Sequence, residues 1–183
     1  MEHNITASYG NVRVRPICKN DLEFLRKWRN EIKVHFLTQM GHITPEMQEA
    51  WHERNKFLAD SYMFAIDEVQ ELNRLVGSAA LYDIKNNIAE YGRVLVGDSY
   101  AHGKGVGYMA TVLCLYVGFE KLRLARVIAN VHEDNHAAVK SYSKAGFETC
   151  KSYLDNNGHK MLEIAIEKND FYRKHDFLAE IKM

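Results

Sequence analysis

The alternation of apolar and polar positions predicts a strand near the start of the chain. Val12, Val14 and Ile17 alternate with arginines, and Pro16 ends this strand. Apolar runs predict further strands at 62–66, 75–82, 88–96, 125–131 and 161–166. The three strands within 62–96 follow one another at short spacing, which is typical of an antiparallel meander. The turn at 155–158 precedes the last strand and indicates a hairpin.

Capping signals predict two helices between the first strand and the meander. Asn20 or Asp21 is expected to cap the first helix, which ends in the basic and aromatic cluster at 25–30. Thr44 and Pro45 are typical of a second helix start, as cap and as first helical residue. The side chains expected on the buried side of this second helix are Met47, Trp51 and Phe57 or Leu58. Trp28 and Trp51 are therefore expected to flank one cleft.

Helical spacing continues in the second half of the chain. Apolar residues recur at helical intervals over 108–119, where Tyr116 is expected to pack on the sheet. A further helix is predicted from about Asn135 to Lys144, and it stops at Gly146. The tail at 168–183 is polar and amphipathic and predicts a surface helix.

Length and charge bound the classes of protein. At 183 residues the chain suits one domain, expected over 1–183 with its core at about 12–168 and the surface helix at 169–183. Its 24 basic and 24 acidic residues balance, so neither nucleic acid nor an anionic membrane is indicated as a partner.

Cysteines and apolar runs bear on the compartment. Cys18, Cys114 and Cys150 are an odd number without a paired motif, so we expect buried structural thiols in a reducing compartment. No apolar run approaches the length of a membrane span, and the first ten residues lack the apolar centre of a signal peptide. The expected location is the cytoplasm.

A glycine-rich stretch connects the strand at 88–96 to the helix at 108–119. It consists of His102, Gly103, Lys104, Gly105, Val106 and Gly107. Glycine lets the backbone turn sharply, so several N–H groups can point at one anion, and the helix start adds its own free N–H groups and positive dipole end. The stretch therefore suits a phosphate or pyrophosphate, although a tight strand-to-helix connection has the same pattern.

The spacing narrows the kind of phosphate site. A P-loop requires Ser or Thr after Gly-Lys, and a dinucleotide fold places Gly-x-Gly-x-x-Gly in its first βαβ unit; neither fits here. The stretch resembles the acetyl-coenzyme A loop of the GCN5-related N-acetyltransferases (the GNAT family), Gln/Arg-x-x-Gly-x-Gly/Ala. His102 stands where the family usually has Gln or Arg.

A second motif carries the same resemblance. Residues 135–147 read Asn-His-Ala-Ala-Val-Lys-Ser-Tyr-Ser-Lys-Ala-Gly-Phe, similar to the family's Asn-x-x-(Ala/Ser)-x-x-x-Tyr-x-Lys-x-Gly-Phe. The order of predicted elements from Val12 to about Lys168 is also that of the family. The resemblance implies an α/β (α+β) GNAT fold, a mixed, mostly antiparallel sheet flanked by helices. It also implies transfer of acetyl from acetyl-coenzyme A to a primary amine by direct attack in a ternary complex.

The resemblance implies which residues hold the cosubstrate. Tyr142 is expected beside the thioester sulfur, where its phenol protonates the departing thiolate; the alternative is a packing tyrosine. Asn135 is expected to hydrogen-bond the arm of coenzyme A, to cap its helix, or both. The other expected contacts are Leu95, Val96, His102, Gly103, Lys104, Gly105, Val106, Gly107 and Tyr108.

Glu90 is the candidate general base. It lies on the strand before the glycine stretch, where many relatives have a glutamate that acts through water, although it could equally be an exposed strand charge. Asn130 stands where some amino-sugar acetyltransferases have a glutamate, and an amide cannot act as a base at pH 7. His132 and His35 have suitable unperturbed acidity but are expected to be loop or helix histidines. The nine histidines show no ligand spacing beside acids, so no metal site is expected.

The first two helices resemble the acceptor half of amino-sugar N-acetyltransferases in sugar-nucleotide pathways, such as pseudaminic acid synthesis. The expected substrate contacts are Trp28, Arg29, Asn30, Gln48 and Trp51. Arg29 is expected to pair with a diphosphate, and the tryptophans to stack on a base or a sugar face. The preferred acceptor is therefore a UDP-linked 4-amino-4,6-dideoxy sugar.

Other functions stay open at this point. Within the enzyme class, the acceptor could be a protein N-terminus, as in the RimJ/RimL-like ribosomal-protein alanine acetyltransferases, or a polyamine. From another class, a non-catalytic sensor could keep the acetyl-coenzyme A site. The oligomeric state is also open, and a homodimer is one option.

Overall fold

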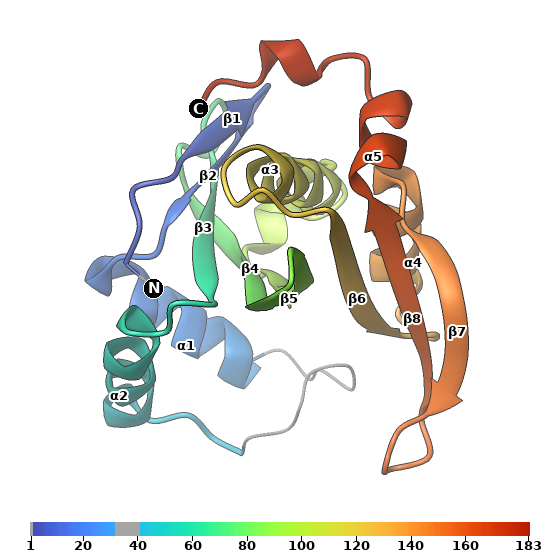
Figure 1. Cartoon of the computed structure of the whole chain (residues 1–183). Helices are drawn as coiled ribbons and strands as arrows, with labels where there is room; N and C mark the ends of the chain where they lie inside the picture. Colours follow the sequence, from blue (N-terminus) through green and yellow to red (C-terminus); the bar gives the residue numbers. More distant parts are fainter. Residues whose placement is uncertain (1, 32–40) are drawn as a thin grey trace.

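A computed structural model describes residues 2–31 and 41–183, and these residues form one curved sheet with helices around it (Figure 1). The strands lie in the order β1-β2-β3-β4-β5-β6-β8-β7. Their bounds are Ala7–Tyr9 (β1), Val12–Pro16 (β2), Tyr62–Glu68 (β3), Arg74–Lys85 (β4), Ile88–Val96 (β5), Arg126–His132 (β6), Glu148–Leu154 (β7) and Lys160–Glu167 (β8). The helices are Leu22–Glu31 (α1), Pro45–Lys56 (α2), Val106–Glu120 (α3), His136–Ala145 (α4) and Lys168–Lys174 (α5).

The sheet is mixed and mostly antiparallel, as expected. β1 to β5 pair antiparallel in sequence order, and β6, β8 and β7 also pair antiparallel. β5 and β6 form the parallel pair that joins the two halves. The predicted meander, the β7–β8 hairpin and the strand at β6 are confirmed.

The predicted helix ends are confirmed where a capping side chain or a glycine fixes them. The Thr44 hydroxyl accepts from the Met47 N–H, with Pro45 as the first residue of α2. Asn135 caps α4, and Gly146 ends that helix in the left-handed region with φ 106°. The α1 cap differs from the prediction: Asp21 belongs to a short 3₁₀ turn and accepts from the Cys18 N–H while it pairs with Arg15.

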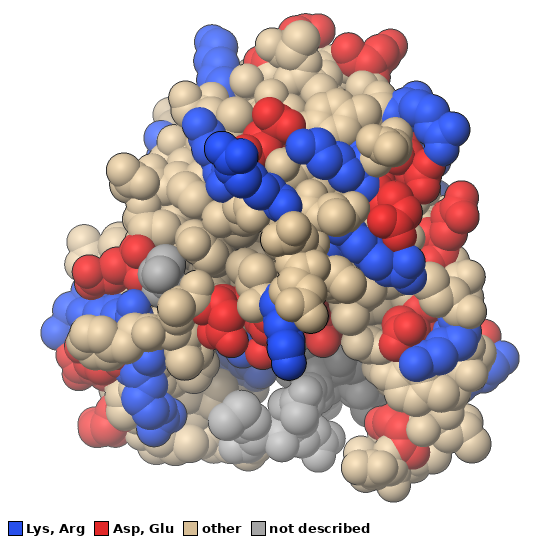
Figure 2. All heavy atoms as spheres, viewed as in Figure 1, with Lys and Arg blue, Asp and Glu red and all other residues tan. Residues whose placement is uncertain are grey.

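The apolar core surrounds α3. This helix is buried on nearly all sides, because it packs on the sheet, on α4 and on the C-terminal segment; Tyr116 is half-buried. None of the helices in the described ranges is both long and apolar enough to cross a membrane. On the face seen in Figure 2, basic and acidic side chains are interspersed.

Of the apolar residues predicted on the buried side of α2, only Trp51 turns inward. Met47 and Leu58 are exposed, and Phe57 is 83% exposed. The inward stripe instead carries Gln48, which is only 7% exposed, together with residues three and seven positions later, Trp51 and Asn55. A helix that turns a polar stripe inward faces a cleft and contributes little to the core.

The C-terminal segment is not one long surface helix. α5 covers only Lys168–Lys174, and the chain then returns to β1, where Ser8 and Lys182 exchange two backbone hydrogen bonds (Figure 1). Phe171, Leu178 and Ile181 are buried, so this tail covers the core. Helical periodicity missed it because an extended return segment buries side chains at another spacing.

The three cysteines differ in their exposure. Cys114 is buried, as predicted, but Cys18 and Cys150 are exposed, so the prediction of buried thiols is wrong for both.

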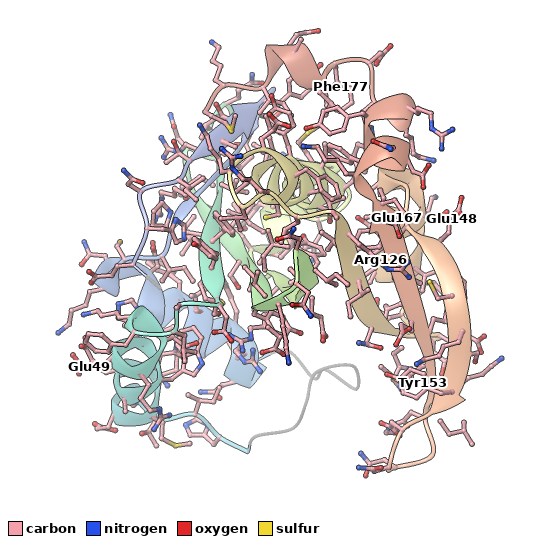
Figure 3. All side chains as sticks on the ribbon, in the orientation of Figure 1. Glu49, Arg126, Glu148, Tyr153, Glu167 and Phe177 are labelled. Atoms are coloured by element: carbon pink, nitrogen blue, oxygen red, sulfur yellow. The ribbon has the colours of Figure 1, made fainter. Side chains whose placement is uncertain are left out.

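An ion pair connects two strands in the second half of the sheet. Arg126 and Glu167 pair across β6 and β8 at 2.7 Å, with Glu148 nearby on β7 (Figure 3). That pair helps to fix the register of the two strands.

Candidate active site

β5 and β6 pair over only three residues and then separate. The paired residues are Ile88–Glu90 with Arg126–Ile128. Beyond them β5 continues to Val96 along β4 with a bulge, since Ala80 faces Gly92 while Ser78 faces Leu95. Arg93 lies in this bulge with φ 52°, a left-handed conformation that is rare for a residue with a side chain. The end of β5, with Leu95 and Val96, is therefore paired with β4 alone, and its other edge is left open on the side where β6 has separated from it.

The glycine stretch forms the start of α3. Gly103 and Gly105 both have φ 75°, and Gly105 is the left-handed N-cap of the 15-residue helix. A Cβ at either position would meet no atom within 4 Å, so the backbone at this turn is open. Gly107 lies inside the first helical turn, where a Cβ would contact only Val96 at 3.7 Å. Two of the three glycines thus have the conformation that an anion-binding turn needs.

The side chains of the stretch are engaged with the protein. The His102 ring nitrogen Nε2 lies 2.8 Å from the Val96 carbonyl oxygen. Lys104 pairs with Glu71, and the ammonium of Lys144 lies 4.1 Å from the centre of the Tyr108 ring. Any pyrophosphate contact here therefore comes first from backbone N–H groups and the helix dipole.

Tyr142 lies at the buried end of α4, and its side chain faces β5. It is 7% exposed, with its ring edge-on to Tyr91 at 5.8 Å and tilted against Phe147 at 5.5 Å. Burial raises the pKa of Tyr142 above that of a free phenol. Its hydroxyl therefore stays protonated at neutral pH, as a proton donor must. Asn135 caps α4 by accepting from the Ala138 N–H at 3.2 Å, so the capping alternative is observed.

Glu90 is held by a neighbour that sequence reasoning missed. The Tyr82 hydroxyl donates to a Glu90 carboxylate oxygen at 2.6 Å. The guanidinium of Arg93 stacks over the Tyr82 ring at 4.4 Å and also contacts Asn55 and Met63. Arg93, Tyr82 and Glu90 thus form a row along the face of the sheet near α2.

The acceptor residues predicted on α1 have different surroundings from one another. Trp28 packs on the backbone of Gly97, directly after β5, where a Cβ would lie 2.1 Å from the ring. Asn30 exchanges two hydrogen bonds with the Ile43 backbone, both at 2.9 Å, and so holds the approach to α2. Arg29 is half-buried, and burial together with Arg93 lowers its pKa. The structure thus brings Trp28 to the end of β5 and Arg29 near Arg93, and gives Asn30 a structural contact.

Trp51 does not meet Trp28 in the way the sequence suggested. It lines a cavity beside the N-terminal segment, whereas Trp28 packs on Gly97 and Phe24. Gln48 is buried one turn before Trp51 on α2. Trp28 is not among the residues that line the cavity beside Trp51, so the prediction that the two tryptophans flank one cleft is wrong for this cavity.

The other polar residues considered for the site are Asn130, His132 and His35. Asn130 accepts a hydrogen bond from the Tyr153 hydroxyl at 2.9 Å, near the far end of the β7–β8 hairpin (Figure 3). His132 is mostly buried, and its ring lies 4.9 Å from that of His159. His35 lies outside the described residues. Within the described ranges, no three His, Cys, Asp or Glu side chains form a metal-binding group.

Comparison with known proteins settles the family. The model of the family described as "Acetyltransferase (GNAT) domain" matches residues 11–148. This chain belongs to the GNAT family.

Related sequences and structures agree with this assignment. An N-acetyltransferase 9-like protein of Caenorhabditis briggsae is 26% identical over 133 residues, 67% of each chain. The GNAT fold is also similar to spermidine N-acetyltransferase of Vibrio cholerae in complex with coenzyme A and spermine, with TM-score 0.78 and 17% identity over 88% of this chain and 98% of that one. Mycobacterium smegmatis RimJ in complex with CoA-disulfide matches with TM-score 0.75 and 18% identity over 92% and 88%.

The GNAT protein is thus an acetyl-coenzyme A-dependent N-acetyltransferase. The structure adds Tyr82, Arg93 and Gly97 to the residues that sequence reasoning found around the site. One signal could have located Tyr82. The asparagine pair at 86–87 is typical of a two-residue hairpin turn, and a regular hairpin at this turn puts Tyr82 within one residue of the position opposite Glu90. No pattern in the sequence indicated the bulge at Arg93.

Proposed function

We propose that this GNAT protein transfers acetyl to the primary amine of a nucleotide-linked amino sugar, of the UDP-4-amino-4,6-dideoxy type. The observation that carries the acceptor class is the pair Arg29 and Arg93. Arg29 is half-buried with Arg93 as its charged neighbour, and the described residues offer neither of them a carboxylate partner. Residues 32–40 contain no Asp or Glu either.

Two neighbouring guanidinium groups without a carboxylate favour an anionic ligand. Each cation repels the other, and a diphosphate relieves this repulsion through charge-assisted, bidentate hydrogen bonds. A polyamine would add further positive charge to the same place. The acceptor site therefore supports a phosphate-bearing amine over spermidine, even though a spermidine acetyltransferase shares the fold.

The cosubstrate fits the open turn at the start of α3. The left-handed Gly103 and Gly105 and the following helix turn would hold the pyrophosphate through backbone N–H groups. Leu95 and Val96 would hold the pantetheine along the edge of β5, where it parts from β6. When bound, acetyl-coenzyme A supplies a thioester carbonyl for attack by the amine.

Two side chains would move the protons of the reaction. Glu90, oriented by the Tyr82 hydroxyl at 2.6 Å, takes the proton of the attacking amine through a water molecule. As the C–S bond breaks, the departing thiolate receives the phenolic proton of Tyr142, which burial keeps on the oxygen. The amine nitrogen keeps the new C–N bond, and Tyr142 regains a proton from solvent.

The test is release of coenzyme A thiol from acetyl-coenzyme A with different acceptors. A UDP-linked 4-amino-4,6-dideoxy sugar, an alanine-initiated peptide and spermidine are offered separately, with acceptor-free hydrolysis as the control. The expected result is fast release with the nucleotide sugar and an acetylated sugar in the mass spectrum. Release with only the peptide or only spermidine would overturn the acceptor assignment.

A further inference from the structure

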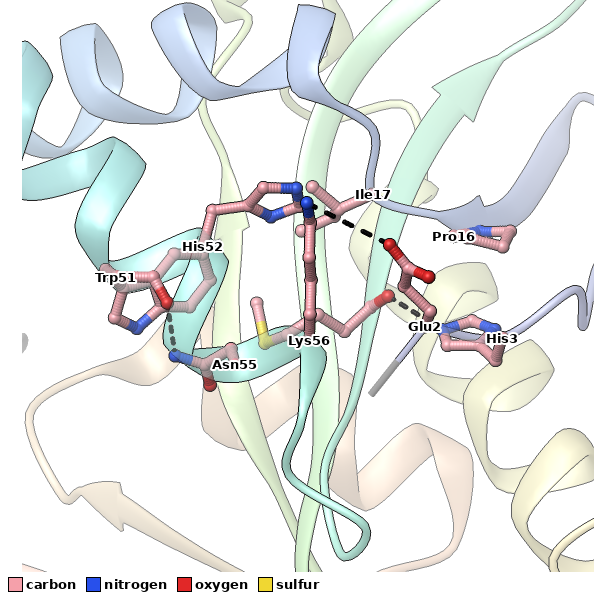
Figure 4. Close-up of a pocket in the computed structure, with 9 residues that line it drawn as sticks. Glu2, His3, Pro16, Ile17, Trp51, His52, Asn55 and Lys56 are labelled. Carbon is pink, nitrogen blue, oxygen red and sulfur yellow. Dashed lines mark hydrogen bonds and ion pairs between the residues drawn. The ribbon is translucent and has the colours of Figure 1, made fainter.

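A cavity of about 240 Å³ lies between α2, β3 and the N-terminal segment (Figure 4). Its walls include Pro16, Ile17, Trp51, His52, Asn55 and Met63. The Trp51 and His52 side chains extend from successive positions of α2, and His52 lies beside Ile17 (Figure 4). No step of the acetyl transfer above uses this cavity.

The imidazoles in the wall are uncharged near neutral pH. His3 accepts from the Ile5 N–H at Nδ1, so its Nε2 donates to the Met63 carbonyl at 3.0 Å. Burial lowers the pKa of His3, and burial followed by Lys56 lowers that of His52. The charged groups at the cavity are Glu2 and Lys56, which lie 3.9 Å apart and offset each other. The cavity is therefore suited to a neutral ligand.

The His52 imidazole contrasts with that of His3. Among the described residues it has no hydrogen-bond partner, so its ring nitrogens are available to a ligand. A neutral imidazole offers one donor and one acceptor, which matches the polar edge of a heterocyclic base. The indole of Trp51 supplies a flat apolar wall against which such a ring stacks.

The size of the cavity limits the ligand to a single ring system. Pockets that enclose a drug-sized molecule have volumes of about 300–1,000 Å³. At about 240 Å³ this cavity is too small for a whole nucleotide sugar. The remainder of such a ligand must lie outside it.

The inner wall of the cavity connects it to the arginine pair. Asn55 and Met63 line the cavity, and both contact the Arg93 guanidinium, at 3.4 Å from the amide oxygen and 3.6 Å from the sulfur. Arg93 in turn stacks on Tyr82, which holds Glu90. The cavity, Arg93 and the candidate base Glu90 are therefore linked by direct contacts along the sheet, and Arg29 is the charged neighbour of Arg93.

We propose that this cavity is the nucleobase subsite of the acceptor: a uracil ring stacks on Trp51 and hydrogen-bonds His52, with its diphosphate at Arg93 and Arg29. This inference rests on the proposed nucleotide-linked acceptor. It gives Trp51 a base-binding role separate from that of Trp28, which lies at the end of β5.

The experiment titrates uridine and UMP, without acetyl-coenzyme A, into the full chain and its variants by calorimetry and saturation-transfer NMR. Trp51→Ala and His52→Ala are expected to weaken binding of both probes at least tenfold. Trp51→Phe, which keeps an aromatic wall, should retain most of the affinity. Phe57→Ala is the matched control, because Phe57 follows the same helix but is 83% exposed and does not line the cavity.

Each outcome bears on the proposal. Uridine binding that Trp51→Ala and His52→Ala lose and Phe57→Ala keeps, with circular dichroism unchanged, supports it. Failure of uridine and UMP to bind at millimolar concentration overturns it, as does binding that the two cavity variants leave intact. Trp51-dependent binding of phenylalaninamide without uridine binding also overturns it and assigns the cavity to a peptide.

Failure of this proposal differs from failure of the proposed function. If the nucleotide sugar is acetylated but its KM is unchanged in Trp51→Ala, the function stands and the subsite is wrong. If uridine binds through Trp51 but the nucleotide sugar is not acetylated, the cavity is a uracil-binding site and the assignment of the nucleotide sugar as acceptor is wrong.

Discussion

The indole of Trp28 lies directly on the backbone of Gly97, so close that a Cβ on Gly97 would fall 2.1 Å from the ring atom Cδ2. Gly97 comes directly after β5, and its N–H donates to the Val76 carbonyl at 2.9 Å. This contact joins α1, which carries Arg29, to the strand edge proposed for pantetheine.

Gly97→Ala is therefore expected to displace Trp28. Overpacking of this kind costs about 1–3 kcal/mol of unfolding free energy, and the KM for the amine acceptor should rise as α1 shifts. A denaturant titration and acceptor kinetics measure the two effects. In a Trp28→Ala background, the Gly97→Ala change should cost much less, because the clash is gone; equal costs in both backgrounds would contradict the contact.

Tyr142→Phe removes the phenolic proton but keeps the ring that packs on Tyr91 and Phe147. General acid catalysis typically contributes about 10²–10⁴-fold, so kcat should fall at least about 100-fold. The dissociation constant of acetyl-coenzyme A, measured by calorimetry, should stay within about twofold. A variant with full turnover would show that Tyr142 only packs.

The hydrogen bond between Tyr82 and Glu90 predicts a graded pair of variants. Glu90→Gln removes the candidate base and should lower kcat by about 10²-fold or more. Tyr82→Phe leaves the carboxylate but removes its orienting donor, so a smaller fall, about tenfold, is expected. Stopped-flow measurement of thiol release separates the two. If Glu90→Gln kept wild-type kcat, the base would have to be sought elsewhere.

The buried carboxylate of Glu68 allows a prediction about stability that is independent of catalysis. Its fully buried carboxylate accepts from the N–H groups of Leu72, Gln70 and Glu71. These donors, Leu72 first, lower the pKa of Glu68 below the ordinary value of 4.5. Because the folded pKa is lower than the unfolded one, the carboxylate stabilises the fold above pH 4.5, and this contribution is lost as the pH falls further.

Glu68→Gln is expected to lose on the order of 2 kcal/mol of unfolding free energy at pH 7. Its stability should then decrease less than that of wild type between about pH 5 and pH 3, the range in which carboxyl groups titrate. Urea titrations across that range measure both effects. Glu148→Gln is the control and should behave like wild type, because the Glu148 side chain on β7 is exposed (Figure 3).

Sequence patterns predicted the elements whose ends depend on nearby residues. Thr44 with Pro45 and Asn135 with Gly146 fix two helices through local hydrogen bonds and backbone conformation, and both were found where expected. The glycine stretch likewise forms the predicted turn before α3, although only Gly103 and Gly105 have a positive φ. These features depend on short-range physics that the sequence displays.

The site depended on register, which the sequence does not display. One irregularity between Tyr82 and Lys85, where Asp83 has φ 51°, sets Tyr82 opposite Glu90. The bulge at Arg93 directs that side chain to Tyr82 and Asn55. Because a one-residue shift moves every side chain to the other face of a strand, neither contact follows from periodicity. The polar inward stripe of α2 was missed for a related reason, since cleft-facing helices break the apolar pattern.

The central claim is that the acceptor carries an anionic group. Its most direct test is the ratio of kcat/KM values for an anionic and a cationic acceptor. The measurement compares kcat/KM for the UDP-linked amino sugar with that for spermidine, in wild type and in Arg29→Gln/Arg93→Gln. We predict a wild-type ratio above about 100 that falls at least tenfold, about 1.4 kcal/mol, in the double variant, with the KM for acetyl-coenzyme A unchanged. A wild-type ratio below one, or a ratio that the two arginine substitutions leave unchanged, would contradict the account.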